Sequence, residues 1–165
     1  GRRRLSRLED MQGAQEVESF SGINANEYML YHGASADVID KIIKEGFDLR
    51  YAGSVHGAIF GKGIYFSPNA SKSDLYTGNV SKGGKRTMLI CRVCLGDAYR
   101  TNVTCSDKYM PPQRPDGMRY DSIQGTPAPS GCVMYPENIV FGAQALAQYR
   151  VTYSHDDDCK CTHCA

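Results

Sequence analysis

The sequence predicts an α+β fold in one domain. The chain has 165 residues, a length that suits a single domain with a real core. Residues 88–95 form a nearly continuous apolar run, broken by Arg92, which is typical of a central strand covered on both sides. Helical and strand patterns follow one another without the regular alternation of a parallel α/β protein, so a mixed architecture is expected.

The first elements are expected to be a strand and a helix. Residues 28–32 are apolar and aromatic and end at Gly33, which favours a buried strand that brings His32 to the start of a loop. A helix follows, with Ser35 as its N-cap and Gly46 as its left-handed stop. The apolar residues of its expected buried stripe are Val38, Ile39, Ile42 and Ile43.

A glycine-rich loop, a strand and a short helix come next. The glycines of this loop are Gly53, Gly57, Gly61 and Gly63. Residues 64–66 then resume strand character, and Pro68 and Asn69 begin a helix that runs to about Tyr76. Such a helix places Ser73 and Tyr76 one turn apart on one face.

The second half of the chain is expected to contain short strands around a long connection. Residues 106–131 are rich in Pro, Gly and polar groups, which indicates an irregular segment with a strand fragment at 122–124. The last strands are expected over residues 132–135, 139–141 and 149–153.

Charge and hydropathy argue against two classes of partner. The net charge is +1, so no broad field attracts nucleic acid or a membrane surface. The short basic cluster of Arg2, Arg3, Arg4 and Arg7 is interpreted as a tail. No apolar run reaches the ~18 residues that span a bilayer, so no membrane partner is expected.

Cysteine usage favours an intracellular protein. Seven cysteines cannot all pair, and Cys91 and Cys94 lie in the apolar run where thiols act as small core residues. Asn-x-Ser/Thr triplets at Asn69, Asn79 and Asn102 keep open the alternative of a glycosylated, secreted protein.

The two ends are expected to differ from the middle. Residues 1–27 are polar and lack both an initiator Met and a secretory segment, which indicates a partly irregular segment of a chain excised from something longer. Residues 154–165 form a tail with donors for zinc. Its weak candidate ligands are Cys159, Cys161, His163 and Cys164. Their spacing of one or no residues strains a single tetrahedral site, so no metal is assigned and a disordered or truncated tail is favoured.

Common nucleotide motifs do not fit the glycine-rich loop. Lys62 is not followed by Ser or Thr, and a strand follows instead of a helix, so a P-loop is excluded. The glycine spacings of four, four and two exclude a dinucleotide fingerprint. Glycine here is expected to allow a ligand close to the backbone.

A set of motifs in order along the chain carries a resemblance. These are His32-Gly33, Gly46-Phe47-Asp48, Gly61-Lys62-Gly63-Ile64-Tyr65-Phe66 with Ser71-Lys72-Ser73, and Tyr135-Pro136-Glu137. Over residues 28–153 the sequence resembles the catalytic domain of the poly(ADP-ribose) polymerase family, and within it the tankyrases. The resemblance implies an ADP-ribosyltransferase fold, a split, mostly antiparallel β-sandwich with flanking helices. The tankyrase zinc insertion is missing between Tyr76 and Met88.

The resemblance also implies a catalytic triad of His32, Tyr65 and Glu137. Cleavage between nicotinamide and ribose passes through an oxocarbenium-like state that a carboxylate stabilises, and Glu137 is the expected carboxylate. On residue type alone Glu137 would be a solvated acid at a strand edge.

The remaining contacts of the co-substrate NAD+ are assigned in the same way. His32 is expected to bond the adenosine ribose, and the Gly33 backbone with Ser73 the nicotinamide carboxamide. Tyr65 and Tyr76 are expected to stack on the pyridinium ring. The further candidates for cofactor binding are Ser35, Arg50, Phe66, Ser67 and Lys72. Ala34 departs from the family's usual hydroxyl residue, which puts one adenosine contact in doubt.

The expected function is NAD+-dependent transfer of ADP-ribose to protein side chains. Lys72 stands where chain-elongating members of the family keep a lysine, so mono- and poly-transfer both stay open. The alternatives are an NAD glycohydrolase and a non-catalytic module that binds NAD or ADP-ribose. The expected partners are NAD+ and a protein acceptor, with no direct contact to nucleic acid, and a monomer is expected for this fragment.

Overall fold

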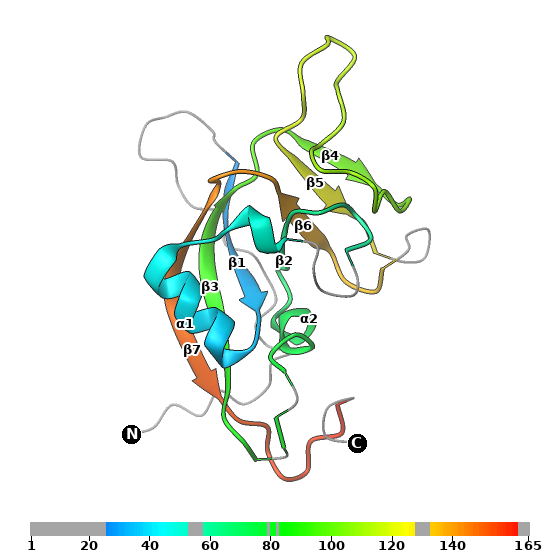
Figure 1. Cartoon of the computed structure of the whole chain (residues 1–165). Helices are drawn as coiled ribbons and strands as arrows, with labels where there is room; N and C mark the ends of the chain where they lie inside the picture. The colour runs from blue at the N-terminus through cyan, green and yellow to red at the C-terminus, as the bar shows by residue number, and fades with distance from the viewer. Residues whose placement is uncertain (1–25, 53–57, 79, 82, 128–132, 162–165) are drawn as a thin grey trace.

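In the computed structural model, two β-sheets form the frame of the molecule (Figure 1). The structure describes residues 26–52, 58–78, 80–81, 83–127 and 133–161. The sheets are mostly antiparallel and the helices are few, so the α+β expectation is confirmed. Within these ranges no helix has the length and apolar character needed to cross a membrane.

The first sheet has the order β1-β3-β7 and is antiparallel throughout. Its strands are β1 (Glu27–Gly33), β3 (Arg86–Cys94) and β7 (Ala145–Tyr153). The apolar run does form the central strand, and Leu89, Cys91 and Val93 are fully buried. β7 begins four residues before the expected strand at 149–153.

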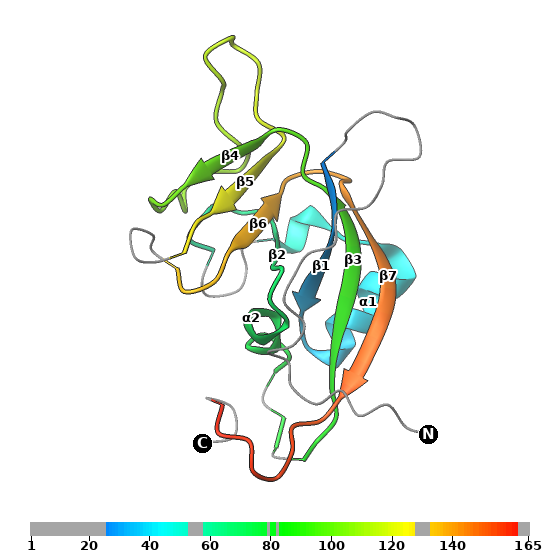
Figure 2. The same cartoon turned by 180° about the vertical axis from the view of Figure 1, so that it is seen from behind.

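Helix α1 (Ala36–Glu45) lies over one face of this sheet (Figure 2). Gly46 ends it with a φ of 82°, as expected, and Ser35 stands at the N-cap with an extended backbone and no side-chain cap. The prediction that four apolar residues of this helix are buried was wrong, because the buried stripe is narrower. Ile39 is fully buried, whereas Val38 and Ile43 are 45% and 49% exposed, because a helix packed on a narrow sheet buries only its central line.

The second sheet has the order β2-β6-β5-β4. Its strands are β2 (Ile64–Phe66), β6 (Glu137–Val140), β5 (Ser122–Gly125) and β4 (Ala98–Thr101). β4 and β5 are parallel and the other pairs are antiparallel. Every residue of β6 is buried, so this strand sits inside the sheet.

Three sequence expectations for this region need correction. β4 was not foreseen, and β6 covers Glu137–Val140 instead of 139–141. The strand expected over 132–135 is absent among its described residues 133–135, where Val133 makes an isolated bridge to Pro127. Pro136 explains part of this, since it has no N–H to donate to a ladder. Cys132, Gly53 and Gly57 lie outside the described residues.

Helix α2 (Ala70–Asp74) joins the two sheets. Its Ala70 packs with Tyr31 and Met88 of the first sheet, on the face opposite α1. The backbone of Ser67, just after β2, exchanges two hydrogen bonds with Tyr31 of β1, at 2.8 and 3.0 Å. The helix is shorter than expected, because it ends at Asp74. Tyr76 lies in the turn that follows, and its N–H donates to Ser73 O at 3.1 Å.

Gly33 allows α2 to lie close to β1. A Cβ at this position would stand 1.7 Å from the backbone oxygen of Ser73 and 2.6 Å from its carbonyl carbon. Backbone atoms cannot turn away as a flexible side chain does. The end of β1 therefore tolerates only glycine at the separation from α2 that the fold adopts.

We predict that Gly33→Ala destabilises the protein by about 3 kcal/mol or more, the upper part of the range for overpacking. Urea denaturation followed by circular dichroism measures this loss. Gly142→Ala is the matched control, since a Cβ there meets only Gln144 Oε1, at 3.4 Å. Equal stabilities of the two variants would contradict the account of the contact between β1 and α2.

Candidate active site

A buried carboxylate with one oxygen lacking a protein partner marks the candidate site. Glu137 begins β6, and its side chain is 3% exposed. Its Oε1 lies 2.9 Å from Lys72 Nζ, whereas Oε2 has no hydrogen-bond partner among the described residues. A buried charged oxygen without a partner is costly, so Oε2 is placed to accept a bond from a ligand.

The backbone holds Glu137 in place from both sides. Glu137 pairs with Gly125 of β5 in the sheet register. The Ser67 hydroxyl donates to the carbonyl oxygen of Pro136 at 2.9 Å and accepts from Asn69 N at 3.1 Å. Because Ser67 also bridges to β1, the residue before Glu137 is tied to the first sheet.

Lys72 brings a cation from α2 to this carboxylate. Its side chain is 18% exposed, and its Nζ lies 5.2 Å from the centroid of the Tyr76 ring. Burial acts to lower the pKa of Lys72, but its hydrogen bonds to Glu137 and Tyr76 outweigh burial and raise it. Lys72 therefore stays protonated at neutral pH and offsets the charge of Glu137.

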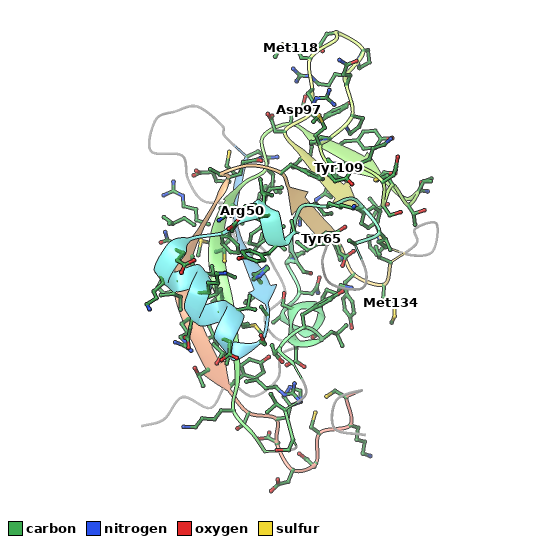
Figure 3. The ribbon with its side chains drawn as sticks, viewed as in Figure 1. Arg50, Tyr65, Asp97, Tyr109, Met118 and Met134 are labelled. Atoms are coloured by element: carbon green, nitrogen blue, oxygen red, sulfur yellow. The ribbon has the colours of Figure 1, made fainter. Side chains whose placement is uncertain are left out.

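Tyr65 lies on β2, directly opposite Ile139 of β6 (labelled in Figure 3). Its hydroxyl donates to Gly61 O at 2.8 Å and accepts from Phe60 N at 2.9 Å. Burial raises the pKa of Tyr65, and the nearby charge of Glu137 adds to the effect. The ring is thus a fixed, neutral surface beside the carboxylate.

His32, near the end of β1, is held against β2. Its Nδ1 lies 2.8 Å from Tyr65 O, and its ring packs against Phe47 and Phe66 at 5.1 and 5.4 Å between centroids. Burial lowers the pKa of His32, with the bond to Tyr65 acting in the opposite direction, so the ring is neutral at pH 7. A carbonyl only accepts, so Nδ1 carries the proton and Nε2 is an acceptor.

α2 gathers three of the expected ligand contacts. Lys72 faces Glu137, and Ser73, which is 4% exposed, touches the end of β1 at Gly33. Tyr76 follows within one turn, next to Lys72. The structure thus brings Gly33, Lys72, Ser73 and Tyr76 into one neighbourhood with Glu137.

The other expected contacts lie differently. Phe66 is 2% exposed and packs in the core, and Ser67 uses its hydroxyl within the protein. Ser35 is exposed at the start of α1. The side chain of Arg50 is 85% exposed and paired with Asp48 at 2.6 Å (Figure 3). Roles of these four residues in cofactor binding stay predictions.

Sequence reasoning missed one residue of chemical interest. His155 is 7% exposed and stands within reach of Cys159 and Cys161. No motif surrounds it, and only a pattern that included histidines upstream of the Cys pair could have found it.

Comparisons with known proteins identify the family and several relatives of the chain. A family model described as poly(ADP-ribose) polymerase catalytic domain matches residues 2–153. The protein mono-ADP-ribosyltransferase PARP11 of Mus musculus is 32% identical in an alignment 138 residues long, which covers 70% of this chain and 40% of the relative. The protein mono-ADP-ribosyltransferase PARP12 of Homo sapiens is 31% identical in an alignment 134 residues long, which covers 79% of this chain and 18% of the relative.

The chain spans less than half the length of these curated relatives. The resemblance to tankyrases is more specific than these matches, which show membership of the family and no particular subgroup. A family model that covers residues 2–153, most of the chain, shows the family. The chain belongs to the poly(ADP-ribose) polymerase catalytic domain family.

Proposed function

We propose that the chain is an NAD+-dependent ADP-ribosyltransferase that breaks the bond between nicotinamide and ribose and transfers ADP-ribose to a protein side chain. The carrying observation is Glu137, whose Oε2 is buried and has no partner among the described residues. Family membership supplies the reaction class. The site supplies a group suited to its transition state.

The chemistry needs one anion at the sugar. As the glycosidic bond breaks, positive charge develops on the ribose, and a fixed carboxylate in a buried site stabilises that charge better than water does. Glu137 Oε2 is able to accept a ribose hydroxyl while Oε1 stays with Lys72. Nicotinamide leaves as a neutral molecule, so the site needs no strong general acid.

The neighbouring residues suit the two ends of NAD+. The Gly33 backbone and Ser73 meet at the contact of β1 with α2, where a carboxamide finds both donors and acceptors. Tyr65, which is near enough to Glu137 to feel its charge, and Tyr76, whose ring centroid lies 5.2 Å from Lys72 Nζ, are the rings proposed to stack on the pyridinium cation. His32 Nε2, as an acceptor, suits a hydroxyl of the adenosine ribose.

The number of ADP-ribose units transferred is a separate part of the proposal. The relatives PARP11 and PARP12 are named as mono-ADP-ribosyltransferases, and the Lys72–Glu137 pair leaves room for elongation. Incubation of the chain and a mixture of acceptor proteins with labelled NAD+, followed by gel electrophoresis, separates the outcomes. A sharp band means single transfer, a smear means polymer, and free ADP-ribose alone means a glycohydrolase.

An intracellular location is also part of the proposal. Cys91 is fully buried in the core, and burial raises the pKa of its thiol to about 12. Such a thiol acts as a packing residue, which suits a reducing compartment.

We predict that Glu137→Gln lowers kcat by about 100-fold or more while NAD+ affinity changes little. The amide keeps the shape and removes the charge that only the transition state requires. Stopped-assay turnover and equilibrium binding of NAD+ measure the two quantities. Glu27→Gln is the matched control, because Glu27 also pairs with a cation, Arg92, at 2.6 Å. Unchanged turnover in Glu137→Gln would remove Glu137 from the mechanism.

A second prediction concerns the stability of the buried pair. Lys72→Met alone leaves the Glu137 charge without its partner, and we expect a loss of about 3 kcal/mol. Combining it with Glu137→Gln should restore part of this loss, with a coupling of about 1–3 kcal/mol. Urea denaturation of the four proteins gives the coupling.

The Arg92–Glu27 pair serves as the control cycle. Its side chains are 39% and 21% exposed, so the coupling should stay below about 1 kcal/mol. Strict additivity of Lys72→Met and Glu137→Gln would mean that the ion pair does not join α2 to β6.

A further inference from the structure

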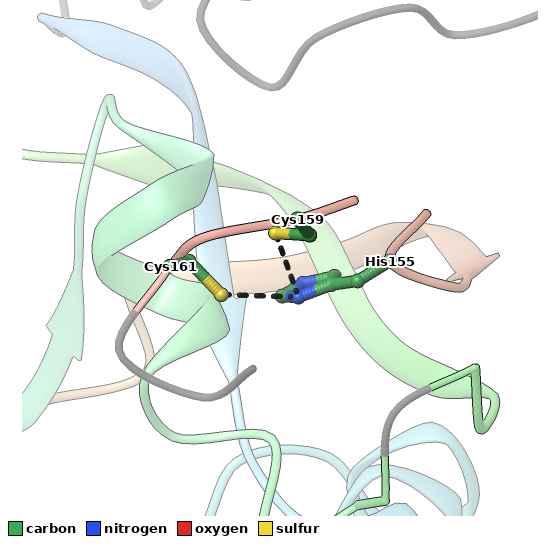
Figure 4. A group of neighbouring side chains, drawn as sticks. All are labelled: His155, Cys159 and Cys161. Carbon is green, nitrogen blue, oxygen red and sulfur yellow. Dashed lines mark hydrogen bonds between the residues drawn. The ribbon is translucent and has the colours of Figure 1, made fainter. Parts of the chain in front are cut away.

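Three side chains at the C-terminal end gather around one point. Beyond β7, His155 Nδ1 lies 3.2 Å from Cys161 Sγ and 3.7 Å from Cys159 Sγ (Figure 4). Their ligand atoms all lie within 4.8 Å of one another. A turn in which Cys159 N donates to Asp156 O at 3.0 Å brings the chain back toward His155.

These separations suit a single metal ion. With zinc bonds of about 2.3 Å to sulfur and about 2.0 Å to nitrogen, the ligand atoms of a tetrahedral site stand roughly 3.5 Å apart. Two sulfurs and an imidazole nitrogen form a soft donor set, which favours zinc over magnesium or calcium. The cluster therefore has both the size and the chemistry of a zinc site.

The second ring nitrogen of His155, Nε2, has a partner that orients the ring for metal binding. His155 Nε2 lies 3.1 Å from the carboxylate of Asp74, which is 4% exposed. Because a carboxylate accepts, Nε2 carries the proton, and the lone pair of Nδ1 is directed at the two sulfurs. Tyr153 donates its hydroxyl to the same carboxylate and stacks on the His155 ring at 5.9 Å. A carboxylate that orients a histidine in this way is the usual support of a metal ligand.

We propose that His155, Cys159 and Cys161 hold a structural zinc ion. His155, four residues before Cys159, adds a ligand from outside the closely spaced Cys stretch, and the three ligand atoms lie within 4.8 Å of one another. Structural zinc takes four ligands, and His163 and Cys164, the other two candidates from the sequence, lie outside the described residues.

The proposed zinc site connects the C-terminal segment to α2, the helix that carries Lys72, the partner of Glu137. Asp74 is the last residue of α2, directly after Ser73. The segment that follows β7 runs below α2 in both views (Figures 1 and 2). Zinc would therefore fix the tail against α2 and stabilise the position of that helix.

The test measures bound zinc in the whole chain. Protein expressed with zinc and dialysed against metal-free buffer should contain about one zinc per chain by elemental mass spectrometry. Cys159→Ser combined with Cys161→Ser should lose it, and Asp74→Asn should weaken zinc affinity by about 10- to 100-fold. Cys105→Ser is the matched control and should keep its zinc, because Cys105 belongs to a different hydrophobic cluster.

A second measurement covers variants that fold poorly. Cobalt added to the wild-type chain stripped of metal should give the visible absorption of a tetrahedral thiolate site, and thermal denaturation should shift to lower temperature when zinc is removed. Absence of zinc and of the cobalt spectrum in the wild-type chain would overturn the proposal. So would full zinc content in the double Cys variant, or a Cys159–Cys161 disulfide found by peptide mass spectrometry in protein prepared without reductant.

Discussion

The ion pair between Lys72 and Glu137 is the interaction on which the candidate site depends. Lys72 belongs to α2, which packs on the first sheet, and Glu137 begins β6, an inner strand of the second sheet. Taking two charges out of water costs several kcal/mol, and hydrogen bonds at good geometry must offset that cost. The pair is therefore weak evidence for stability and strong evidence for a site, because one carboxylate oxygen is left for something else.

Backbone contacts carry the rest of the arrangement. The exchange between Tyr31 and Ser67 joins β1 to the end of β2, and the Ser67 hydroxyl extends this link to Pro136. Tyr65 closes the loop before β2 by bonding the backbone at both Phe60 and Gly61. These hydrogen bonds, each with at least one main-chain partner, fix the residues around the site, so the site is organised before a ligand arrives.

Local patterns predicted the elements that depend on local chemistry. The run that became β3 was continuous enough to be recognised, and Gly46 ended α1 as its positive φ requires. β4 was missed because Ala98–Thr101 has no apolar alternation and is held by pairing with β5. For the site, the motif order predicted that Glu137, Lys72 and Ser73 belong together, and the structure brings them into one neighbourhood. The exposure of the Arg50 side chain and the short distances from His155 to Cys159 and Cys161 depend on tertiary packing. The spacing of residues along the sequence does not predict such packing.

The fixed tautomer of His32 has a consequence for the choice of dinucleotide. With Nδ1 committed to Tyr65 O and the ring neutral, Nε2 presents a lone pair and no proton. A ribose hydroxyl satisfies that nitrogen by donating to it. A phosphate ester at the same position brings only acceptors and negative charge, so under the proposed function this ring discriminates against NADP+ through repulsion between lone pairs.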